Sequence, residues 1–334
     1  MSKRMLMVLS AACALAALGM ARAQGPAATE TVVHTFKTGA PNGSFAYPGV
    51  IRDPAGNLYG TTVYGGTSGA GVLYKVDSSG KETVLYNFTG GADGGYPYAT
   101  PIADSAGNLY GTTENGGTAN PNGGVVYKVD VAGHETVLHS FTGGADGQIP
   151  SAGVIRDSAG NLYGTTQYGG TGGWGVVYKL DTSGTETVLY TFTGGADGAK
   201  PFAGVIGDSQ GGLYGTTYSG GTGAGVVYRL DKTGKETVLY TFTGGADGGQ
   251  PLTGVIGDAA GNLYGTTSHG GTANVGVVYE LGPGGHETVL HSFTGGADGG
   301  SPNGVIRDSA GDLYGTAEDG GKSSGGVVYL IKPH

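Results

Sequence analysis

The chain has 334 residues, of which 73 are glycine and only 13% are charged, and its formal net charge is −9. A mildly acidic chain that is poor in Lys and Arg argues against a nucleic-acid partner, because binding a phosphate backbone needs clustered positive charge. The glycine content is far above the usual ~7%, but the glycines recur at fixed places between apolar runs, which indicates turns rather than disorder.

The first 23 residues have the pattern of an export signal. Lys3 and Arg4 are followed by an apolar stretch over 5–20, and residues 21–23 fit a small-x-small cleavage site before Gln24. The apolar stretch is short for a membrane span. We therefore expect a signal peptide over 1–23 and an exported protein, periplasmic or extracellular, without a membrane span.

The only cysteine, Cys13, lies within this leader. Lipid attachment at Cys13 is disfavoured, because Ser10 stands where such sites usually have leucine and the preceding apolar run is short. The mature chain then has no disulfide, so its stability must come from its core. It ends at 332–334 without an apolar tail, and we expect no anchor there.

A lone strand at Glu30–Phe36 precedes six near-identical repeats, each of which contains Leu-Tyr-Gly. The tyrosines of this motif are 51, 53, 51, 50 and 50 residues apart. A period near 50 suits one four-stranded blade of a β-propeller and is too long for one turn of a β-helix. The motif tyrosines are Tyr59, Tyr110, Tyr163, Tyr214, Tyr264 and Tyr314.

The third repeat shows the pattern expected of one blade. Residues 157–161 form a tight turn, because Asp157 can bond its own backbone and Gly160 supplies a positive φ. No stretch has helical periodicity, and the apolar runs are rich in β-branched and aromatic residues. The four strands are expected at 153–156 (strand a), 162–166 (strand b), 176–180 (strand c) and 186–192 (strand d).

The two ends of the chain complement each other. The lone strand at Glu30–Phe36 has the sequence of a strand d, and the last repeat stops after its strand c at 327–331. In a ring, the N-terminal strand would complete the last blade and remove the open edges of a linear array. We therefore predict one all-β domain over 24–334: a six-bladed β-propeller with four antiparallel strands per blade, closed by the N-terminal strand. An open β-solenoid or a stack of hairpins is the alternative.

The repeated motifs also resemble a known family. Gly-Asn-Leu-Tyr-Gly-Thr-Thr, Gly-Val-Val-Tyr, Glu-Thr-Val-Leu-Tyr-Thr-Phe and Thr-Gly-Gly-Ala-Asp-Gly are similar to the repeats of the Gloeo/Verruco (GloVer) tandem-repeat proteins of bacteria. The resemblance covers nearly the whole mature chain. It implies export and a repeat fold, and it implies no particular activity.

One face of the predicted propeller is the better candidate for function. The a–b and c–d turns are short and uniform, whereas the b–c and d–a loops on the other face are longer and varied, and binding usually resides in such loops. Of 21 tyrosines, 15 occupy repeated strand positions. The remaining tyrosines, two phenylalanines and the only tryptophan all lie in b–c or d–a loops, where they could bind sugar rings or a protein partner, or could simply reflect longer loops. These residues are Phe45, Tyr47, Tyr64, Tyr96, Tyr98, Tyr168, Trp174, Phe202 and Tyr218.

A second candidate is the loop Gly-Gly-Ala-Asp-Gly, which occurs in five of the d–a loops. Five carboxylates around a channel mouth could bind Ca²⁺, which prefers oxygen ligands. The stronger interpretation is local, because Asp-Gly is a turn dipeptide whose side chain caps backbone N–H groups. The aspartates are Asp93, Asp146, Asp197, Asp247 and Asp298.

Signals of catalysis are few. Only His269 of the seven histidines lies in a loop of the candidate face, and no nucleophile elbow, His-Glu-x-x-His motif or phosphate loop is present. Glu114, Glu318 and Asp319 directly follow strand b, and a pair of carboxylates about 5–10 Å apart would suffice for glycoside hydrolysis. We predict a binding module for carbohydrate or cell-envelope ligands, or next a protein partner, with no cofactor except the Ca²⁺ alternative. A propeller glycosidase or polysaccharide lyase, and a structural envelope protein without a specific ligand, are the alternatives.

Overall fold

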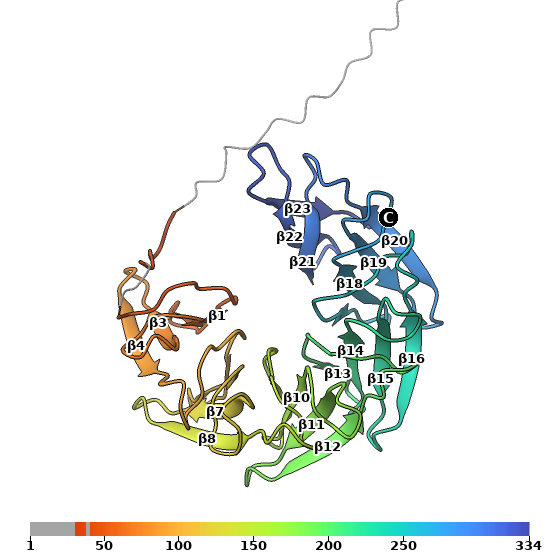
Figure 1. The fold of residues 1–334 in the computed structure, drawn as a ribbon. Coiled ribbons are helices and arrows are strands. Elements are labelled where there is room, and N and C mark those ends of the chain that lie inside the picture. Colours follow the sequence, from red (N-terminus) through yellow and green to blue (C-terminus); the bar gives the residue numbers. More distant parts are fainter. Residues whose placement is uncertain (1–30, 38–40, 334) are drawn as a thin grey trace, which may run out of the picture. The chain divides into compact units, whose positions relative to one another are not determined.

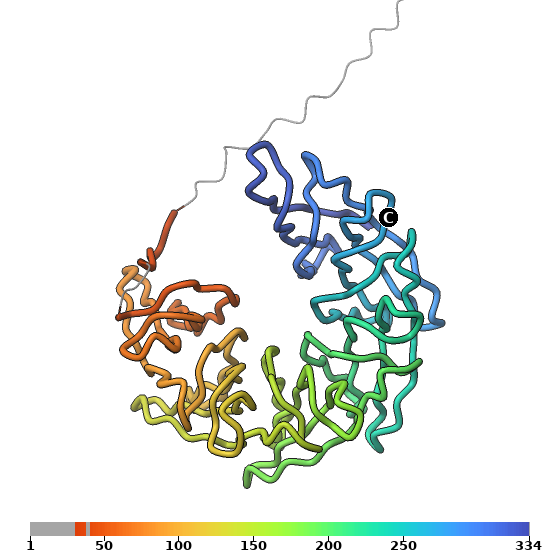
Figure 2. Tube along the Cα trace, viewed as in Figure 1, coloured from red at the N-terminus to blue at the C-terminus, as the bar shows by residue number. Residues whose placement is uncertain are grey.

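The computed structural model describes residues 31–37 and 41–333, which contain strands and turns but no helix. The chain divides into two units between Val33 and His34. The 23 strands of the described residues lie in the second unit and form six antiparallel sheets that follow one another around a common centre (Figure 1). Figure 2 traces the chain through these sheets in sequence order. The predicted all-β, six-bladed propeller is confirmed, whereas the predicted signal peptide lies outside the described residues.

Each of the first five sheets contains four strands in chain order, and the sixth contains three. Blades 1 to 3 are formed by β1 (Ile51–Arg52), β2 (Leu58–Thr62), β3 (Val72–Val76) and β4 (Glu82–Asn87); β5 (Ile102–Ala103), β6 (Leu109–Thr113), β7 (Val125–Val129) and β8 (Glu135–Ser140); and β9 (Ile155–Arg156), β10 (Leu162–Thr166), β11 (Val176–Leu180) and β12 (Glu186–Thr191). Blades 4 to 6 are formed by β13 (Ile206–Gly207), β14 (Leu213–Thr217), β15 (Val226–Leu230) and β16 (Glu236–Thr241); β17 (Ile256–Gly257), β18 (Leu263–Thr267), β19 (Val277–Leu281) and β20 (Glu287–Ser292); and β21 (Gly300–Arg307), β22 (Leu313–Asp319) and β23 (Val327–Ile331).

The sequence located strands b and c of the third blade to the residue, since β10 and β11 have the predicted bounds. Strand a is shorter than predicted and begins only at Ile155. The residues before it bind the neighbouring blade instead of strand b. The Thr112 hydroxyl donates a hydrogen bond of 2.8 Å to the Ala152 carbonyl, and in the same way Thr165 donates to Ala203 at 2.9 Å in the next blade. Strand b threonines therefore connect consecutive blades through the start of strand a.

The a–b turn has the geometry that its sequence predicts. The Asp157 carboxylate accepts hydrogen bonds from the Asn161 backbone at 2.8 Å and from the Tyr163 hydroxyl at 3.1 Å. Gly160 has a φ of 92°, and the glycines at the same position of the other five blades also have positive φ. These are Gly56, Gly107, Gly211, Gly261 and Gly311.

Replacing Gly160 with valine is expected to destabilise the protein by about 1 kcal/mol or more, because a β-branched residue is strained at positive φ. A Cβ there would also lie 2.9 Å from the Arg156 guanidinium. Gly257→Val is the matched control, because Gly257 is in a strand and its nearest side-chain contact for a Cβ is 3.7 Å. Thermal unfolding measures both variants, and equal melting temperatures would contradict the strain argument.

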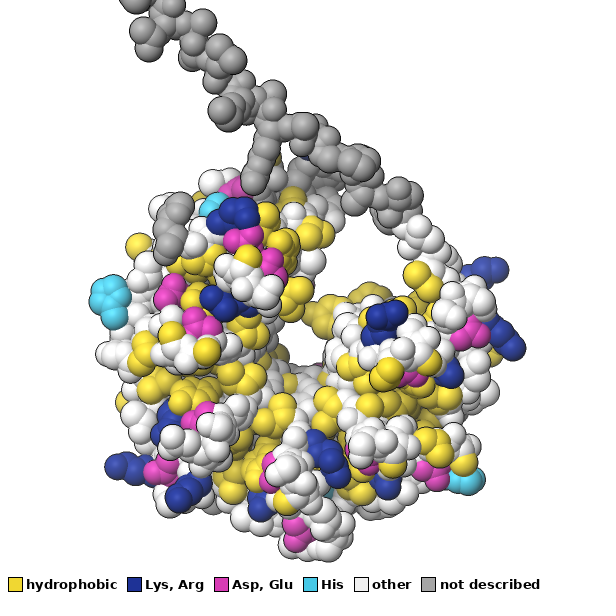
Figure 3. Space-filling view, turned by 180° about the vertical axis from the view of Figure 1, so that it is seen from behind, with side chains coloured by type: hydrophobic (Ala, Val, Ile, Leu, Met, Phe, Trp, Pro, Cys, Tyr) yellow, Lys and Arg dark blue, Asp and Glu magenta, His cyan; other side chains and the backbone are white. Residues whose placement is uncertain are grey.

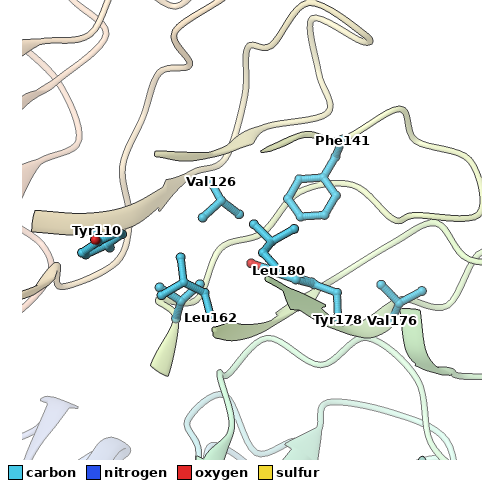
Figure 4. Close-up of a cluster of buried hydrophobic side chains, with 8 residues drawn as sticks. Tyr110, Val126, Phe141, Leu162, Val176, Tyr178 and Leu180 are labelled. Carbon is cyan, nitrogen blue, oxygen red and sulfur yellow. The ribbon is translucent and has the colours of Figure 1, made fainter. Parts of the chain in front are cut away.

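Each junction between consecutive blades has a hydrophobic core of its own. Between blades 2 and 3, Val126 and Phe141 pack with Leu162, Val176 and Tyr178 (Figure 4). The ring centroids of Phe141 and Tyr178 are 5.1 Å apart in an edge-to-face geometry, which adds about 0.5–1.5 kcal/mol to the burial of the two rings. The same pair recurs at the later and earlier junctions as Phe88–Tyr127, Phe192–Tyr228, Phe242–Tyr279 and Phe293–Tyr329.

The first blade has the same aromatic contact although no complete blade precedes it in sequence. The ring of Phe36 lies 4.8 Å from that of Tyr74 and packs against a small core that includes Val72 and Val76. Residues 31–37 form no strand. Phe36 nevertheless makes the contact to the first blade that a strand d phenylalanine makes to the blade after it.

The sixth sheet ends at β23 with an open face. Val328 is 81% exposed, whereas its counterpart Val177 is completely buried by the next blade. Closure of this sheet by Glu30–Phe36 involves a residue outside the described range and stays a prediction. The repeat pattern supports closure, because the N-terminal segment has the sequence of a strand d and the last repeat ends after its strand c.

Candidate functional site

The repeats differ most at four positions per blade. In blades 1 to 5, two of these positions lie in the d–a loop and two directly follow strand b, and in blade 6 the corresponding residues lie within β21 and at the end of β22. We call these positions together the variable face. Its six quartets are Phe45, Tyr47, Val63, Tyr64; Tyr96, Tyr98, Glu114, Asn115; Ile149, Ser151, Gln167, Tyr168; Lys200, Phe202, Tyr218, Ser219; Gln250, Leu252, Ser268, His269; and Ser301, Asn303, Glu318, Asp319.

The variable positions are brought together by the backbone. In blade 3, the segment after strand b pairs with the d–a loop, where Gln148 and Tyr168 form an antiparallel bridge and the Gln167 N–H donates to the Ile149 carbonyl at 3.1 Å. The first member of each quartet has a φ between 53° and 61°. This left-handed conformation costs a non-glycine residue about 1–2 kcal/mol. This conformation was not predictable from the sequence, because none of the six residues is a glycine.

Five of the predicted aromatics form one continuous cluster across blades 1 and 2, and we call it the aromatic cluster. It consists of Phe45, Tyr47, Tyr64, Tyr96 and Tyr98. The rings of Phe45 and Tyr47 are parallel with their centroids 5.9 Å apart, and the centroids of the Phe45 and Tyr64 rings are 5.7 Å apart. Tyr64 contacts Tyr96, and Tyr47 contacts Tyr98, each at 5.8 Å. Phe45, Tyr47 and Tyr64 are 56%, 58% and 44% exposed, so the cluster presents ring surface to solvent.

The remaining predicted aromatics lie in two smaller groups. Phe202 packs edge-on against Tyr218 at 5.1 Å, and the Tyr218 hydroxyl donates to the Gln250 side chain at 3.0 Å. The Lys200 ammonium lies 5.4 Å from the Tyr168 ring and 5.9 Å from the Trp174 ring. Tyr96 and Tyr98 are therefore in the aromatic cluster, whereas Trp174 belongs to a separate group with a lysine.

Glu114 lies beside the aromatic cluster in a polar network that sequence reasoning did not find. Its carboxylate accepts a hydrogen bond from Ser151 at 3.1 Å, and Ser151 in turn contacts the Gln167 amide. Burial raises the pKa of Glu114 above its ordinary value, with the Ser151 bond acting in the opposite direction. Burial, a hydrogen bond to Tyr64 and the charge of Glu114 together raise the pKa of Tyr98. A carboxyl group of this kind can donate or accept a proton near an exposed ring surface.

Glu318 and Asp319, the other two predicted carboxylates, have different neighbours. Asp319 accepts a hydrogen bond from Ser301 at 2.9 Å, and Glu318 accepts one from Asn303 at 3.1 Å. Burial and, secondly, the charge of Glu318 raise the pKa of Tyr47, which is in the aromatic cluster. Within the described part of the chain, no three acidic, histidine or cysteine side chains are grouped so that they could hold a metal ion.

The loop aspartates cap their own turns. The Asp197 carboxylate accepts bonds from the Thr193 backbone at 2.7 Å and its hydroxyl at 2.6 Å, and from the Tyr190 hydroxyl at 3.0 Å. In blade 2 the corresponding Asp146 is 3.3 Å from His139. This explains why Tyr and His alternate at this position of strand d, since either side chain contacts the aspartate. Ca²⁺ binding by these aspartates stays a prediction.

On the side of the molecule that Figure 3 shows, the charged side chains are dispersed rather than grouped by sign. Figure 3 shows one side of the molecule, where Lys and Arg alternate with Asp, Glu and apolar side chains. The part of the chain that the structure describes also contains no helix long and apolar enough to cross a membrane.

Comparisons with known proteins agree with this fold. The aldose sugar dehydrogenase of Streptomyces coelicolor, solved with bound PQQ, is 12% identical with a TM-score of 0.52, over 89% of this chain and 96% of its own. A luciferin-regenerating enzyme is 15% identical with a TM-score of 0.52, over 87% and 92%. The extracellular domain of a proposed hybrid two component system of B. thetaiotaomicron is 12% identical with a TM-score of 0.53, over 89% of this chain and 35% of that one. At these identities the likeness shows the fold alone.

Sequence comparison identifies the family. None of the curated proteins matches this sequence. The sequence profile of the Gloeobacter/Verrucomicrobia repeat matches residues 21–224 and 222–334, which together cover all of the sequence after residue 20. The match agrees with the resemblance of the repeated motifs described above. The chain therefore belongs to the Gloeobacter/Verrucomicrobia repeat family.

Proposed function

We propose that this protein is an exported binding module that holds carbohydrate or cell-envelope ligands on its variable face, with the aromatic cluster as the main contact. The observation that supports this is that five aromatic rings outside the repeated strand positions contact one another, on a scaffold that is otherwise nearly constant. Three of these side chains are more than 40% exposed. Flat rings with polar tips suit the apolar faces and hydroxyl groups of sugars.

The neighbouring groups fit the same proposal. Glu114, Ser151 and Gln167 offer hydrogen-bond partners at the edge of the aromatic cluster. Binding sites are commonly formed by an apolar surface with a few polar groups that fix the orientation of the ligand. The remaining predicted aromatics extend the same face and would contact a longer oligosaccharide. They are Tyr168, Trp174, Phe202 and Tyr218.

The proposal predicts that replacing Phe45, Tyr47 and Tyr64 together with alanine weakens glycan binding at least about tenfold, since each ring contact is worth roughly 1 kcal/mol. The fold should remain intact, because these side chains are largely exposed. Glycan-array binding and circular dichroism measure the two effects. Val131→Ala is the control, because Val131 is 76% exposed in a c–d turn on the opposite face. Unchanged binding by the triple variant would contradict the proposal.

The raised pKa of Glu114 is the one observation that favours a glycosidase or lyase instead. An assay for new reducing ends or unsaturated products on polysaccharides tests this alternative. Turnover that is lost in Glu114→Gln would establish it. Binding without turnover supports the binding module, and the absence of both would favour a structural envelope protein.

A further inference from the structure

Two arginines of strand a stack on tyrosines of the preceding blade, on the side of the molecule where the a–b turns lie. The Arg156 guanidinium is 5.8 Å from the centre of the Tyr110 ring, and the Arg307 guanidinium is 5.5 Å from that of Tyr264. Arg307 also lies 3.9 Å from the carboxylate of Asp258, which accepts a hydrogen bond from Tyr264. The Arg307 guanidinium thus lies near both an aromatic ring and the aspartate of the same a–b turn, whereas the Arg156 guanidinium contacts the corresponding ring.

The junction between blades 3 and 4 has the ring and the carboxylate but lacks the arginine. Gly207 stands at the position that Arg156 and Arg307 occupy in their own blades. Tyr163 and Asp157 keep the same arrangement, with the tyrosine hydroxyl 3.1 Å from the carboxylate. A cavity of about 550 Å³ lies here, and Tyr163, Asp157 and Gly207 are among its lining residues. This volume is in the range of small-molecule sites.

We propose that this cavity binds a guanidinium group, such as an arginine side chain, between the ring of Tyr163 and the carboxylate of Asp157. The Lys179 ammonium already lies 5.9 Å from the Tyr163 ring. It does not exclude a second cation, because Tyr110 has both Lys128 at 5.9 Å and Arg156 at 5.8 Å. The site is on the opposite side from the variable face and is independent of the function proposed above.

The charges around the cavity leave one carboxylate for a ligand. Arg156 also lines the cavity, but its guanidinium is held over Tyr110. Asp208 is 3.1 Å from Arg229 and is therefore already paired. Asp157 has no cationic partner within salt-bridge distance among the described residues, and its oxygens accept hydrogen bonds from Asn161 and Tyr163. Burial acts to raise the pKa of Asp157, but these bonds hold it below its ordinary value, so the carboxylate is charged at neutral pH.

The junction between blades 4 and 5 provides a natural comparison. It also has a glycine, Gly257, at the arginine position. Here, however, the chain supplies a cation of its own from strand c: the Arg229 guanidinium lies 5.4 Å from the Tyr214 ring and donates to the tyrosine hydroxyl at 2.9 Å. At the corresponding place Tyr163 has only the lysine, and the cavity lies beside its ring.

The test is isothermal titration calorimetry of the mature protein with N-acetylarginine amide. We expect saturable binding that is at least tenfold tighter than binding of N-acetylcitrulline amide, the neutral analogue of nearly the same shape. Gly207→Arg should reduce binding at least tenfold, because it places in this junction the arginine that the junctions between blades 2 and 3 and between blades 5 and 6 contain. The substitution fits, since a Cβ at Gly207 would lie 3.5 Å from Ile155, an ordinary contact.

Gly257→Arg is the matched control and should bind N-acetylarginine amide as the parent does. Methylguanidinium and the peptide Gly-Arg-Gly distinguish a free guanidinium compound from the arginine of a partner protein, because only the latter gains from the flanking peptide. Equal binding of the arginine and citrulline compounds, or full binding by Gly207→Arg with a parental melting temperature, would overturn the proposal.

Discussion

A variant that lacks residues 24–37 is expected to unfold at a much lower temperature than the parent protein and to aggregate. The deletion removes Phe36, which packs on Val72, Tyr74 and Val76, and it removes the contact of 3.0 Å between His34 and Glu82. It would also leave the edge of β23 without the strand that we expect to complete the sixth sheet. Open edges and exposed apolar faces promote association between chains. Thermal unfolding and size-exclusion chromatography measure the two effects.

The substitution Phe36→Ala distinguishes two possibilities: the N-terminal segment either closes the ring of blades or only lies loosely against the first blade. If Phe36 is enclosed between the last and first blades, Phe36→Ala should cost about 3–5 kcal/mol, the usual cost for a buried phenylalanine, and should match Phe192→Ala. Deletion of 24–29 alone should have no effect, because it spares the whole Glu30–Phe36 segment. A cost below about 1 kcal/mol for Phe36→Ala would show that the N-terminal segment does not close the sixth blade.

The melting temperature is expected to fall as the pH rises from 5 to 8. Four glutamates at the start of strand d have their pKa raised to about 7, first by burial and then by the charge of an aspartate from the preceding blade. A carboxyl group whose pKa is higher in the folded protein than in the unfolded chain stabilises the fold fully only below the unfolded value of about 4.3, and this contribution is lost as the pH rises through about 7. The pairs are Glu135 with Asp93, Glu186 with Asp146, Glu236 with Asp197 and Glu287 with Asp247.

Other groups do not reverse this trend. Burial lowers the pKa of His139, which favours the fold at higher pH, but this is one group against four. Replacing all four glutamates with glutamine should make the melting temperature nearly independent of pH over this range. Asp231→Asn should leave the pH dependence of the melting temperature unchanged between pH 5 and 8. Hydrogen bonds in its turn lower the pKa of Asp231, so this group changes its charge only below pH 4. A parent protein that is equally stable at pH 5 and pH 8 would show that the four glutamates do not destabilise the fold when they are charged.

The strand pattern was predictable because it depends on local chemistry. Strands b and c are bounded by turn residues and rich in β-branched and aromatic side chains, and the structure places β10 and β11 at the predicted residues. The positive φ of Gly160 follows from the same local logic. Strand a was predicted too long: directly before its predicted start, Ala152 binds Thr112 of the preceding blade, a contact between residues 40 positions apart in the sequence.

The candidate sites were less predictable, because they depend on which blades are neighbours and how their side chains point. The sequence assigned nine aromatics to one face, but it could not separate the five that touch from Trp174, which lies beside Lys200. Nor could it show the cavity beside Gly207, since that requires the stacking of Arg156 and Arg307 in the other junctions as a reference. The packing between blades, rather than the motif within a blade, carries this information.

The left-handed residues of the d–a loops determine how the variable face can change. Their φ is nearly the same whether the residue is Phe45, Ile149 or Ser301, so the direction of the Cα–Cβ bond is imposed by the hydrogen bonds of the loop and not by the side chain. A substitution at such a position changes the chemistry on display without moving its point of attachment. The side chains of the variable face can therefore be exchanged one blade at a time while the scaffold stays as it is.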